Sequence, residues 1–436
     1  MAITDPLLLP ADVILARVAE LRPDVRERIS CHEEDYAITR PRSRTPSKIV
    51  DSAAAELLKA FRSPKTITDA VIEYSGARNR DPEQILEAVF PLLRELIEAR
   101  FLIPSGGANA EGITASWTSG DRVAGFEIIE RIQVVEDTEV YRVRLDASCA
   151  AALKITRPGV SPRVRRAFER EELILRGVEG SVAPRLLEAG TFEDRSYLAV
   201  EWLPGIPCDV AAARLRKSPS RDQLLDLCHA ILCAYADLHS RGVIHSDVHP
   251  RNVLFQDDGS VKLVDFGLAR IEGASDLTGR VHRGGIGFFF EPEYASACLR
   301  GQPAPQSTFQ GEQYALAALL YFLLTRAHYL DFSFEKSDMM RQIAEDAPLP
   351  FARRNILPWP DVETALGTAL RKLPGERFPS VAELGRAIRT AATANKQQCP
   401  TLVESAATRL LDRVLARLAL EGPMMRTGVR GLQSAR

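Results

Sequence analysis

The sequence feature that most limits the fold is a pair of short apolar runs bracketed by two acids and an amide. Asp247 and Asn252 stand five positions apart in HSDVHPRNVLF, and Asp265 follows the second apolar run in VKLVDFG. The DDGS sequence between the runs predicts a β-hairpin, because Asp-Gly steps favour the tight turns that join antiparallel strands. The three polar side chains would then lie at the edges of one hairpin.

These residue types suit phosphoryl transfer, in which Mg²⁺ ions bridge the nucleotide phosphates and a carboxylate orients the attacking hydroxyl. Hard cations prefer carboxylate and amide oxygens, which Asn252 and Asp265 supply. Asp247 is then free to accept the substrate proton. We therefore predict a site that uses ATP and Mg²⁺, with Asn252 and Asp265 as metal ligands and Asp247 as the base.

Residues from about 126 to 390 resemble a eukaryotic-type Ser/Thr protein kinase domain of bacterial style. Besides the motifs above, AALK places Lys154 where the family has its phosphate-binding lysine, and FEREELIL places Glu171 on the following helix as its ion-pair partner. Downstream, Glu293 stands at the glutamate of the family's A-P-E motif, and Arg377 stands at its partner. The resemblance implies an α+β, bilobal protein-kinase fold with an antiparallel sheet in the N-lobe and helices in the C-lobe.

The same resemblance implies an adenine site in the segment YLAVEWLPG. There the backbone of Glu201 and Leu203 would face the base. Val140, Ala152 and Leu254 would form the apolar sandwich around it, as nucleotide pockets of this kind require.

The phosphate loop departs most strongly from the family pattern. Gln133, Val135 and Thr138 occupy the positions of its three glycines. Glycine lets backbone N–H groups approach phosphate closely, whereas the β-branched side chain of Val135 resists such conformations. The acids of EDTE, residues 136–139, would also put negative charge near the triphosphate. This loop argues against tight ATP binding.

Three other departures are milder. Ser246 replaces the arginine that pairs with a phosphorylated activation segment, which changes regulation rather than chemistry. Glu312 replaces the usual aspartate of the buried central helix, and His249 replaces the lysine that contacts the transferred phosphate. Arg251 lies where tyrosine kinases of the family often carry a compensating arginine, and arginine can grip phosphate bidentately. We therefore expect a working site in which Arg251 neutralises developing charge.

Ahead of this region, three helical patterns at residues 51–61, 66–74 and 81–100 are followed by a short strand at 101–103. They predict a small winged-helix-like module, with a generic helical interaction domain as the alternative. The segment 37–104 resembles the peptide-recognition domains of enzymes that modify ribosomally made peptides. Such domains bind a leader peptide by adding a strand.

We accordingly expect four parts. They are an N-terminal module at 1–104, a linker at 105–122, a kinase domain at 123–392 with its N-lobe at 123–203 and its C-lobe at 204–392, and a C-terminal helix and tail at 393–436. The linker is rich in Gly, Ala, Ser and Thr. The terminal helix follows from a capping box at Thr401 and Glu404.

Composition and the N-terminal sequence limit the kinds of partner and cellular location that we expect. The 436 residues carry a net charge of -2 and 45% hydrophobic residues, so nothing in the overall charge indicates nucleic-acid binding. The N-terminus has neither the basic region of a signal peptide nor the apolar length of a membrane span. The seven cysteines form no C-x-x-C pair. We expect a cytoplasmic protein without a membrane or nucleic-acid partner.

Together these features predict an ATP-dependent Ser/Thr protein kinase that phosphorylates a protein or a precursor peptide. The order of module and kinase also resembles the front part of lanthionine synthetases, although we expect no counterpart of their cyclase domain. A pseudokinase scaffold is one alternative, favoured by the phosphate loop. A small-molecule phosphotransferase is another, because the H-P-x-N core also resembles aminoglycoside and choline kinases; D-F-G and Arg377 favour the protein-kinase pattern instead.

Overall fold

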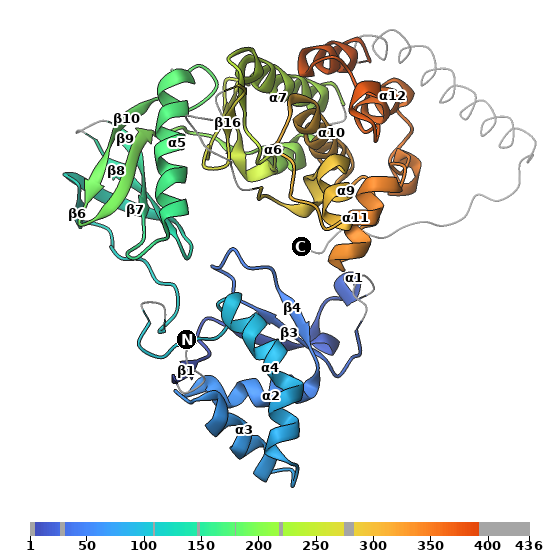
Figure 1. The fold of residues 1–436 in the computed structure, drawn as a ribbon. Helices are drawn as coiled ribbons and strands as arrows, with labels where there is room; N and C mark the ends of the chain where they lie inside the picture. Colours follow the sequence, from blue (N-terminus) through green and yellow to red (C-terminus); the bar gives the residue numbers. More distant parts are fainter. Residues whose placement is uncertain are drawn as a thin grey trace, which may run out of the picture.

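The structure is a computed structural model, which describes residues 5–26, 31–107, 110–145, 149–178, 180–217, 221–273 and 283–391. Figure 1 shows three parts: an N-terminal module in blue, a sheet-rich lobe in green and a helical lobe running from yellow-green to red. The terminal helix expected after Thr401 lies outside the described residues.

In its described residues, the N-terminal module combines two small sheets with three longer helices and the short helix α1 (Pro23–Arg26). Its main elements are β1 (Leu7–Leu8), β2 (Ile14–Arg17), β3 (Tyr36–Thr39), β4 (Lys48–Val50), α2 (Ser52–Lys59), α3 (Ile67–Gly76), α4 (Pro82–Glu98) and β5 (Ile103–Pro104). The predicted helix starts are confirmed, because the side chains of Asp51, Thr66 and Asp81 each accept a hydrogen bond from a first-turn N–H.

The three-stranded sheet β2-β3-β4 was not predicted from the sequence. Its strands contain only three or four residues each and pair across long connections, so no local alternation marks them. The apolar faces of the helices pack together in one core. Ile38 of β3, Phe61, Leu96 and Phe101 belong to this core.

The connection after the module packs against the N-lobe. The Trp117 ring centroid lies 6.0 Å from that of Tyr141. The guanidinium of Arg195 stacks over Trp117 at 4.0 Å. These contacts fasten the connection to the outer face of the N-lobe sheet.

The N-lobe is a six-stranded antiparallel sheet in the order β10-β11-β9-β8-β7-β6 with one long helix. Its elements are β6 (Arg122–Val123), β7 (Phe126–Val134), β8 (Thr138–Arg144), β9 (Ala150–Thr156), α5 (Pro162–Val178), β10 (Leu186–Phe192) and β11 (Arg195–Glu201). Side chains alternate across a sheet, so Tyr141 and Leu153 enter the outer core while Val140, Ala152 and Lys154 share the opposite face.

The C-lobe is built around one buried helix. Its helices are α6 (Cys208–Leu215), α7 (Asp222–Ser240), α9 (Pro292–Leu299), α10 (Phe309–Thr325), α11 (Lys336–Glu345), α12 (Pro360–Ala369) and a helical stretch at 381–391. Nearly every residue of α10 is buried, which explains its continuous apolar sequence. Within the ranges given above, no helix has the length and apolarity to cross a membrane.

The hairpin predicted between the two acids is confirmed. Strands β14 (Val253–Phe255) and β15 (Val261–Leu263) pair antiparallel, and β14 also pairs with β12 (Ile206–Pro207). The hairpin follows directly on the short 3₁₀ helix η3 (Pro250–Asn252). The chain thereby returns Asp265 to the level of Asn252.

Candidate active site

Lys154 lies at the centre of the site. It projects from the middle of β9, where its Nζ is 2.7 Å from a carboxylate oxygen of Glu171 on α5 and 2.7 Å from one of Asp265. The Glu171 side chain is only 6% exposed. The structure therefore brings together the lysine, its helix partner and the predicted metal ligand, which come from three separate stretches of sequence.

The charges of this group are set mainly by burial and by the lysine. Burial lowers the pKa of Lys154, but Asp265 and Glu171 together raise it above its ordinary value. Burial raises the pKa of Asp265, and the opposing charge of Lys154 outweighs it, so that this pKa falls. Burial raises the pKa of Glu171 despite Lys154. Asp265 is consequently the firmer anion of the two, as a cation ligand should be.

The backbone around Asp265 is strained in a way that aims its side chain into the site. Its φ is 64°, in the left-handed region that residues with a side chain rarely adopt. The next residue, Phe266, is fully buried, and its ring lies 4.9 Å from that of His245. The backbone N–H of Phe266 donates to Glu171 at 3.3 Å, and His245 Nε2 lies 3.0 Å from the carbonyl oxygen of Val264. The Asp265 conformation is thus held from both sides.

Asp247 and Asn252 form the second half of the site. The Asn252 amide nitrogen donates to the Asp247 backbone carbonyl at 3.0 Å and to its carboxylate at 3.1 Å. Asn252 itself is buried. Because its NH₂ group is used in this way, its carbonyl oxygen remains for a cation. The predicted base and the predicted amide ligand are therefore in direct contact.

Glu312 on α10 fixes the backbone that carries Asp247. Its carboxylate accepts hydrogen bonds from the backbone N–H groups of His245 at 3.2 Å and Ser246 at 2.6 Å, and lies 2.7 Å from His239 Nε2. Burial raises the pKa of Glu312, but the bonds and charges around it lower it overall. Ser246 has a φ of 67°, so the same carboxylate also supports a strained residue.

The two neighbouring basic positions differ in where they lie. His249 Nε2 is 3.6 Å from the Asp247 carboxylate, and His249 Nδ1 accepts from the backbone N–H of Arg251. The Arg251 side chain is exposed. The residue that the fold brings beside the base is thus His249, and the charge-neutralising role of Arg251 stays a prediction.

The predicted adenine residues lie on the cleft side of the N-lobe and at the junction of the lobes. Val140 pairs with Lys154 across β8 and β9, and Ala152 shares their face; both are half-buried, as is Leu254 on β14. Glu201 ends β11. Among the described residues, no protein group accepts from the backbone N–H of Leu203, which leaves it available to a base.

The phosphate loop of the sequence analysis forms the tight turn between β7 and β8, residues 135–138, which we call the phosphate turn. The backbone N–H of Val135 donates to the carbonyl oxygen of Thr138 at 2.9 Å, which leaves Glu136 and Asp137 at the tip. The expectation that Glu139 adds charge near the triphosphate is wrong, because its side chain is fully buried on the opposite face of the sheet.

Glu139 has several partners on that face. It accepts hydrogen bonds from Ser116, Tyr141 and Arg157 and pairs with Arg195 at 3.3 Å. Strand alternation explains this placement, because residue 139 must point away from the cleft when its neighbour at 140 points toward it. Of the three acids expected near the triphosphate, only the two at the tip of the turn remain candidates.

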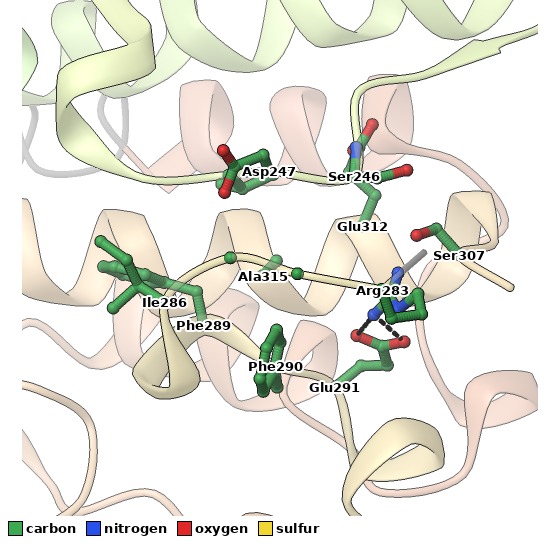
Figure 2. A pocket seen from close by; sticks show the side chains of 14 residues that line it. Ser246, Asp247, Arg283, Ile286, Phe289, Phe290, Glu291, Ser307, Glu312 and Ala315 are labelled. Carbon is green, nitrogen blue, oxygen red and sulfur yellow. Dashed lines mark hydrogen bonds and ion pairs between the residues drawn. The ribbon is translucent and has the colours of Figure 1, made fainter. Parts of the chain in front are cut away.

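A pocket opens beside Asp247, between residues 246–248 and the segment at 283–291 (Figure 2). Gly285 in this segment has a φ of 112°, and a Cβ built there would lie 3.0 Å from an Asp247 carboxylate oxygen. Only glycine therefore allows the chain to pass so close to the Asp247 carboxylate. Figure 2 also shows Arg283 bonded to Glu291, with Nη2 2.6 Å from both carboxylate oxygens.

A second ion pair holds the start of α9, directly after this segment. Arg377, whose side chain is fully buried, donates to the two Glu293 oxygens at 2.9 and 2.7 Å. This is the pairing implied by the sequence resemblance. Pairs of this kind fix geometry more than they add stability.

The donor set fits Mg²⁺ held jointly with a nucleotide. One carboxylate and one amide oxygen, from Asp265 and Asn252, are hard ligands of the type that Mg²⁺ takes together with phosphate oxygens and water. In the described part of the chain, no group of three or more His, Cys, Asp and Glu side chains is arranged to hold a metal. A metal here would be shared with the phosphates of ATP.

Comparisons with known proteins relate this chain to protein kinases. The model of the protein kinase domain matches residues 136–417, more than half of the chain, and its match begins at the tip of the phosphate turn. The probable serine/threonine-protein kinase PknB of Lactococcus lactis is 32% identical over 162 residues, which cover 37% of this chain and 24% of that protein.

The serine/threonine-protein kinase PknL of Mycobacterium tuberculosis is 25% identical over 303 residues, 68% of this chain and 66% of that protein. The crystal structure of a mutant of the M. tuberculosis PknI kinase domain aligns with a TM-score of 0.46 and 21% identity over 64% of this chain and 100% of that one. The chain spans about a quarter to two thirds of the length of these curated relatives. Because the family match covers more than half of its length, the chain belongs to the protein kinase family.

Proposed function

We propose that the protein is an ATP-dependent Ser/Thr protein kinase that transfers the γ-phosphoryl group of Mg·ATP to a hydroxyl side chain. The observation that carries the proposal is the double ion pair of Lys154 with Glu171 and Asp265. Kinases need both the lysine–glutamate pair and the metal-binding aspartate in place before they can react. The names of the relatives, which are Ser/Thr protein kinases, support the same activity.

Each residue has a defined task in this proposal. Lys154, held by Glu171, would position the α- and β-phosphates, and Asn252 with Asp265 would bind the Mg²⁺ that neutralises the phosphate charge. Asp247 would orient the acceptor hydroxyl and take its proton. Its contact with Asn252 at 3.1 Å supports this division, because one side chain then links the metal site to the base.

The acceptor in this proposal is a protein or peptide. The segment at 283–291 passes beside Asp247 and is fixed by the buried ion pair of Arg283 with Glu291. Just after it, Glu293 at the start of α9 pairs with the buried Arg377. A rigid platform next to the base suits an extended chain that presents a hydroxyl.

We further propose that the N-terminal module binds the substrate, such as a precursor peptide, by strand addition. Its sheet has the order β2-β3-β4, so β2 and β4 are both edges that can accept another strand. Lys48 on β4 forms an ion pair with Glu95 on α4, which places a charged helix face beside one edge. Ile14 on the other edge strand is 47% exposed.

The first test is transfer of labelled γ-phosphate from ATP with Mg²⁺, onto the protein itself and onto a generic Ser/Thr substrate. Wild type should be labelled and should label the substrate, while Asp247→Asn and Asp265→Asn should not. Absence of label in wild type, together with no thermal shift by Mg·ATP, would leave the pseudokinase scaffold that the phosphate turn favours.

The peptide proposal needs its own test. Deuterium exchange of the full chain, with and without a precursor peptide, should protect the amides of β2 or β4 and leave those of β3 unchanged, since β3 is already paired on both sides. A peptide that is phosphorylated without protecting either edge strand would refute strand addition and leave the kinase activity standing.

A further inference from the structure

The phosphate turn is covered by a loop from the N-terminal module. This loop, residues 40–47, connects β3 with β4 and projects toward the two lobes (Figure 1). The carbonyl oxygen of Arg42 accepts from the backbone N–H of Glu136 at 3.0 Å, and the Ser43 hydroxyl donates to the Glu136 carboxylate at 2.8 Å. Arg44 Nε donates to the Asp137 carboxylate at 2.8 Å. Both acids at the tip of the turn thus have partners from another domain.

The loop is held rigidly at its base. The Arg40 side chain is only 2% exposed and donates to both Asp12 carboxylate oxygens at 3.1 Å. The Thr45 hydroxyl donates to the carbonyl oxygen of Ala99 at 3.0 Å, and the Arg42 guanidinium donates to that of Ile113. Residues before and after position 44 are therefore anchored, which fixes the place from which the arginine side chain there extends.

The Arg44 guanidinium lies at the tip of the phosphate turn, where Asp137 accepts its Nε–H. Partial burial lowers its pKa, but the carboxylates of Asp137, Asp265 and Asp247 raise it overall, with Asp137 the strongest of the three. The Arg44 side chain is 57% exposed. Within the described residues, its two terminal nitrogens donate to no protein acceptor. They are free for a ligand in the cleft.

We propose that Arg44 is a phosphate-binding residue of this kinase, supplied by the N-terminal module to the terminal phosphates of Mg·ATP. The inference rests on the ATP-dependent function proposed above. Asp137 holds Nε, and the remaining N–H groups of the planar fork then point at phosphate oxygens, which suit bidentate arginine contacts. Arg44 thereby replaces the backbone donors that a glycine-rich loop would offer.

This assignment also accounts for the two acids of the turn. Glu136 and Asp137 would repel a triphosphate if they stood alone. Here the Ser43 hydroxyl donates a hydrogen bond to Glu136, and the Arg44 guanidinium neutralises the charge of Asp137. The missing glycines and the added acids then have one explanation, because the acids of the turn bind the loop that supplies the arginine.

The test is calorimetric binding of a non-hydrolysable Mg·ATP analogue and of Mg·ADP to the full chain, for wild type, Arg44→Ala and Arg44→Lys. A matched control is Arg94→Ala, which removes a 71% exposed arginine from the same module. Loss of a charge-assisted contact should weaken binding of the ATP analogue by about tenfold or more. Binding of ADP should change less, Arg44→Lys should be intermediate, and Arg94→Ala should match wild type.

A second comparison separates phosphate contact from simple neutralisation of Asp137. Asp137→Asn removes the acid, so Arg44→Ala should still weaken binding of the ATP analogue by about tenfold in that background. If Asp137→Asn restores full affinity to Arg44→Ala, Arg44 acts only on the turn and the proposal is wrong. The proposal is also wrong if Arg44→Ala binds the ATP analogue more tightly and transfers phosphate faster than wild type, because the loop would then obstruct the nucleotide site.

The two proposals fail in different ways. A wild-type chain that neither binds the ATP analogue nor transfers phosphate overturns the kinase function and Arg44 with it. A wild-type chain that binds and transfers, with Arg44→Ala indistinguishable from Arg94→Ala, overturns Arg44 alone.

Discussion

Lys154 Nζ lies 2.7 Å from the Asp265 carboxylate, so the side chain expected to bind phosphate and the side chain expected to bind metal already form an ion pair. Glu171 holds the same ammonium from the other side at 2.7 Å. The Asp265 side chain is still 41% exposed, which leaves it open to a cation from the cleft. The Lys154 ammonium is therefore already held in the position in which we expect it to bind phosphate.

We expect Lys154→Met to lower kcat/KM for ATP by about 10²–10³-fold, because one preorganised charge at the phosphates is lost. The measurement is the initial rate of labelled phosphate transfer at several ATP concentrations. Lys59→Met serves as the control, since Lys59 lies on the surface of α2 and forms its ion pair with Glu56 there. Equal rates for Lys154→Met and Lys59→Met would remove Lys154 from the mechanism.

Asp247→Asn should lower kcat by about 10²–10⁴-fold, as loss of a general base does, and leave the affinity for Mg·ATP nearly unchanged. The carboxylate contacts Asn252 and His249 but not Lys154, so the phosphate side of the site should stay intact. Single-turnover rates and analogue binding measured on one preparation separate the two effects. Asp257→Asn, an exposed acid in the nearby turn, is the control.

Most of this site was predictable because its motifs are local. The distance from Asp247 to Asn252 is fixed by a short 3₁₀ turn, and the hairpin that follows returns Asp265 to the same place. The sequence therefore carries the geometry in its spacing. By contrast, the pairing of Arg44 with Asp137 joins residues 93 positions apart, and no spacing marks it. Only the basic run RPRSRTPSK at residues 40–48 hinted at a use for that loop.

The error over Glu139 has a different origin. The acids of the turn form one charged group in the sequence, although neighbours in a strand point to opposite faces. The residue pattern contains the correction, because Val140 belongs to the cleft face. In the N-terminal module, the short strands β2, β3 and β4 escaped detection since their stability comes from pairing and from the helices packed on them, not from their own sequence.

Glu312→Gln should destabilise the fold by about 1–3 kcal/mol at pH 7, because a buried charged acceptor for two backbone N–H groups is weakened. The folded-state pKa of Glu312 is lowered from 4.5, so its contribution is present above that pH and is lost as the pH falls through the folded value. The stability difference between wild type and Glu312→Gln should therefore shrink below about pH 4.5.

Urea unfolding of both proteins between pH 7 and pH 3 measures that difference. Glu376→Gln, which changes an exposed acid of the same lobe, should show a small and constant difference over the range. A difference between wild type and Glu312→Gln that persists unchanged to pH 3 would contradict the assigned direction of the pKa shift.

Arg377→Met should lower the free energy of unfolding by about 1–3 kcal/mol, because it removes a buried guanidinium that donates two hydrogen bonds to the half-buried Glu293. The double variant with Glu293→Met should recover much of this loss, since replacing both partners by apolar side chains removes the unpaired charge. Equilibrium unfolding of wild type, both single variants and the double variant gives the coupling energy. If the pair fixes the start of α9 and thereby the segment at 283–291 that leads into it, the double variant should fold well yet phosphorylate peptides more slowly than wild type, with its affinity for Mg·ATP unchanged. Normal peptide kinetics in that variant would mean that the pair contributes to folding alone.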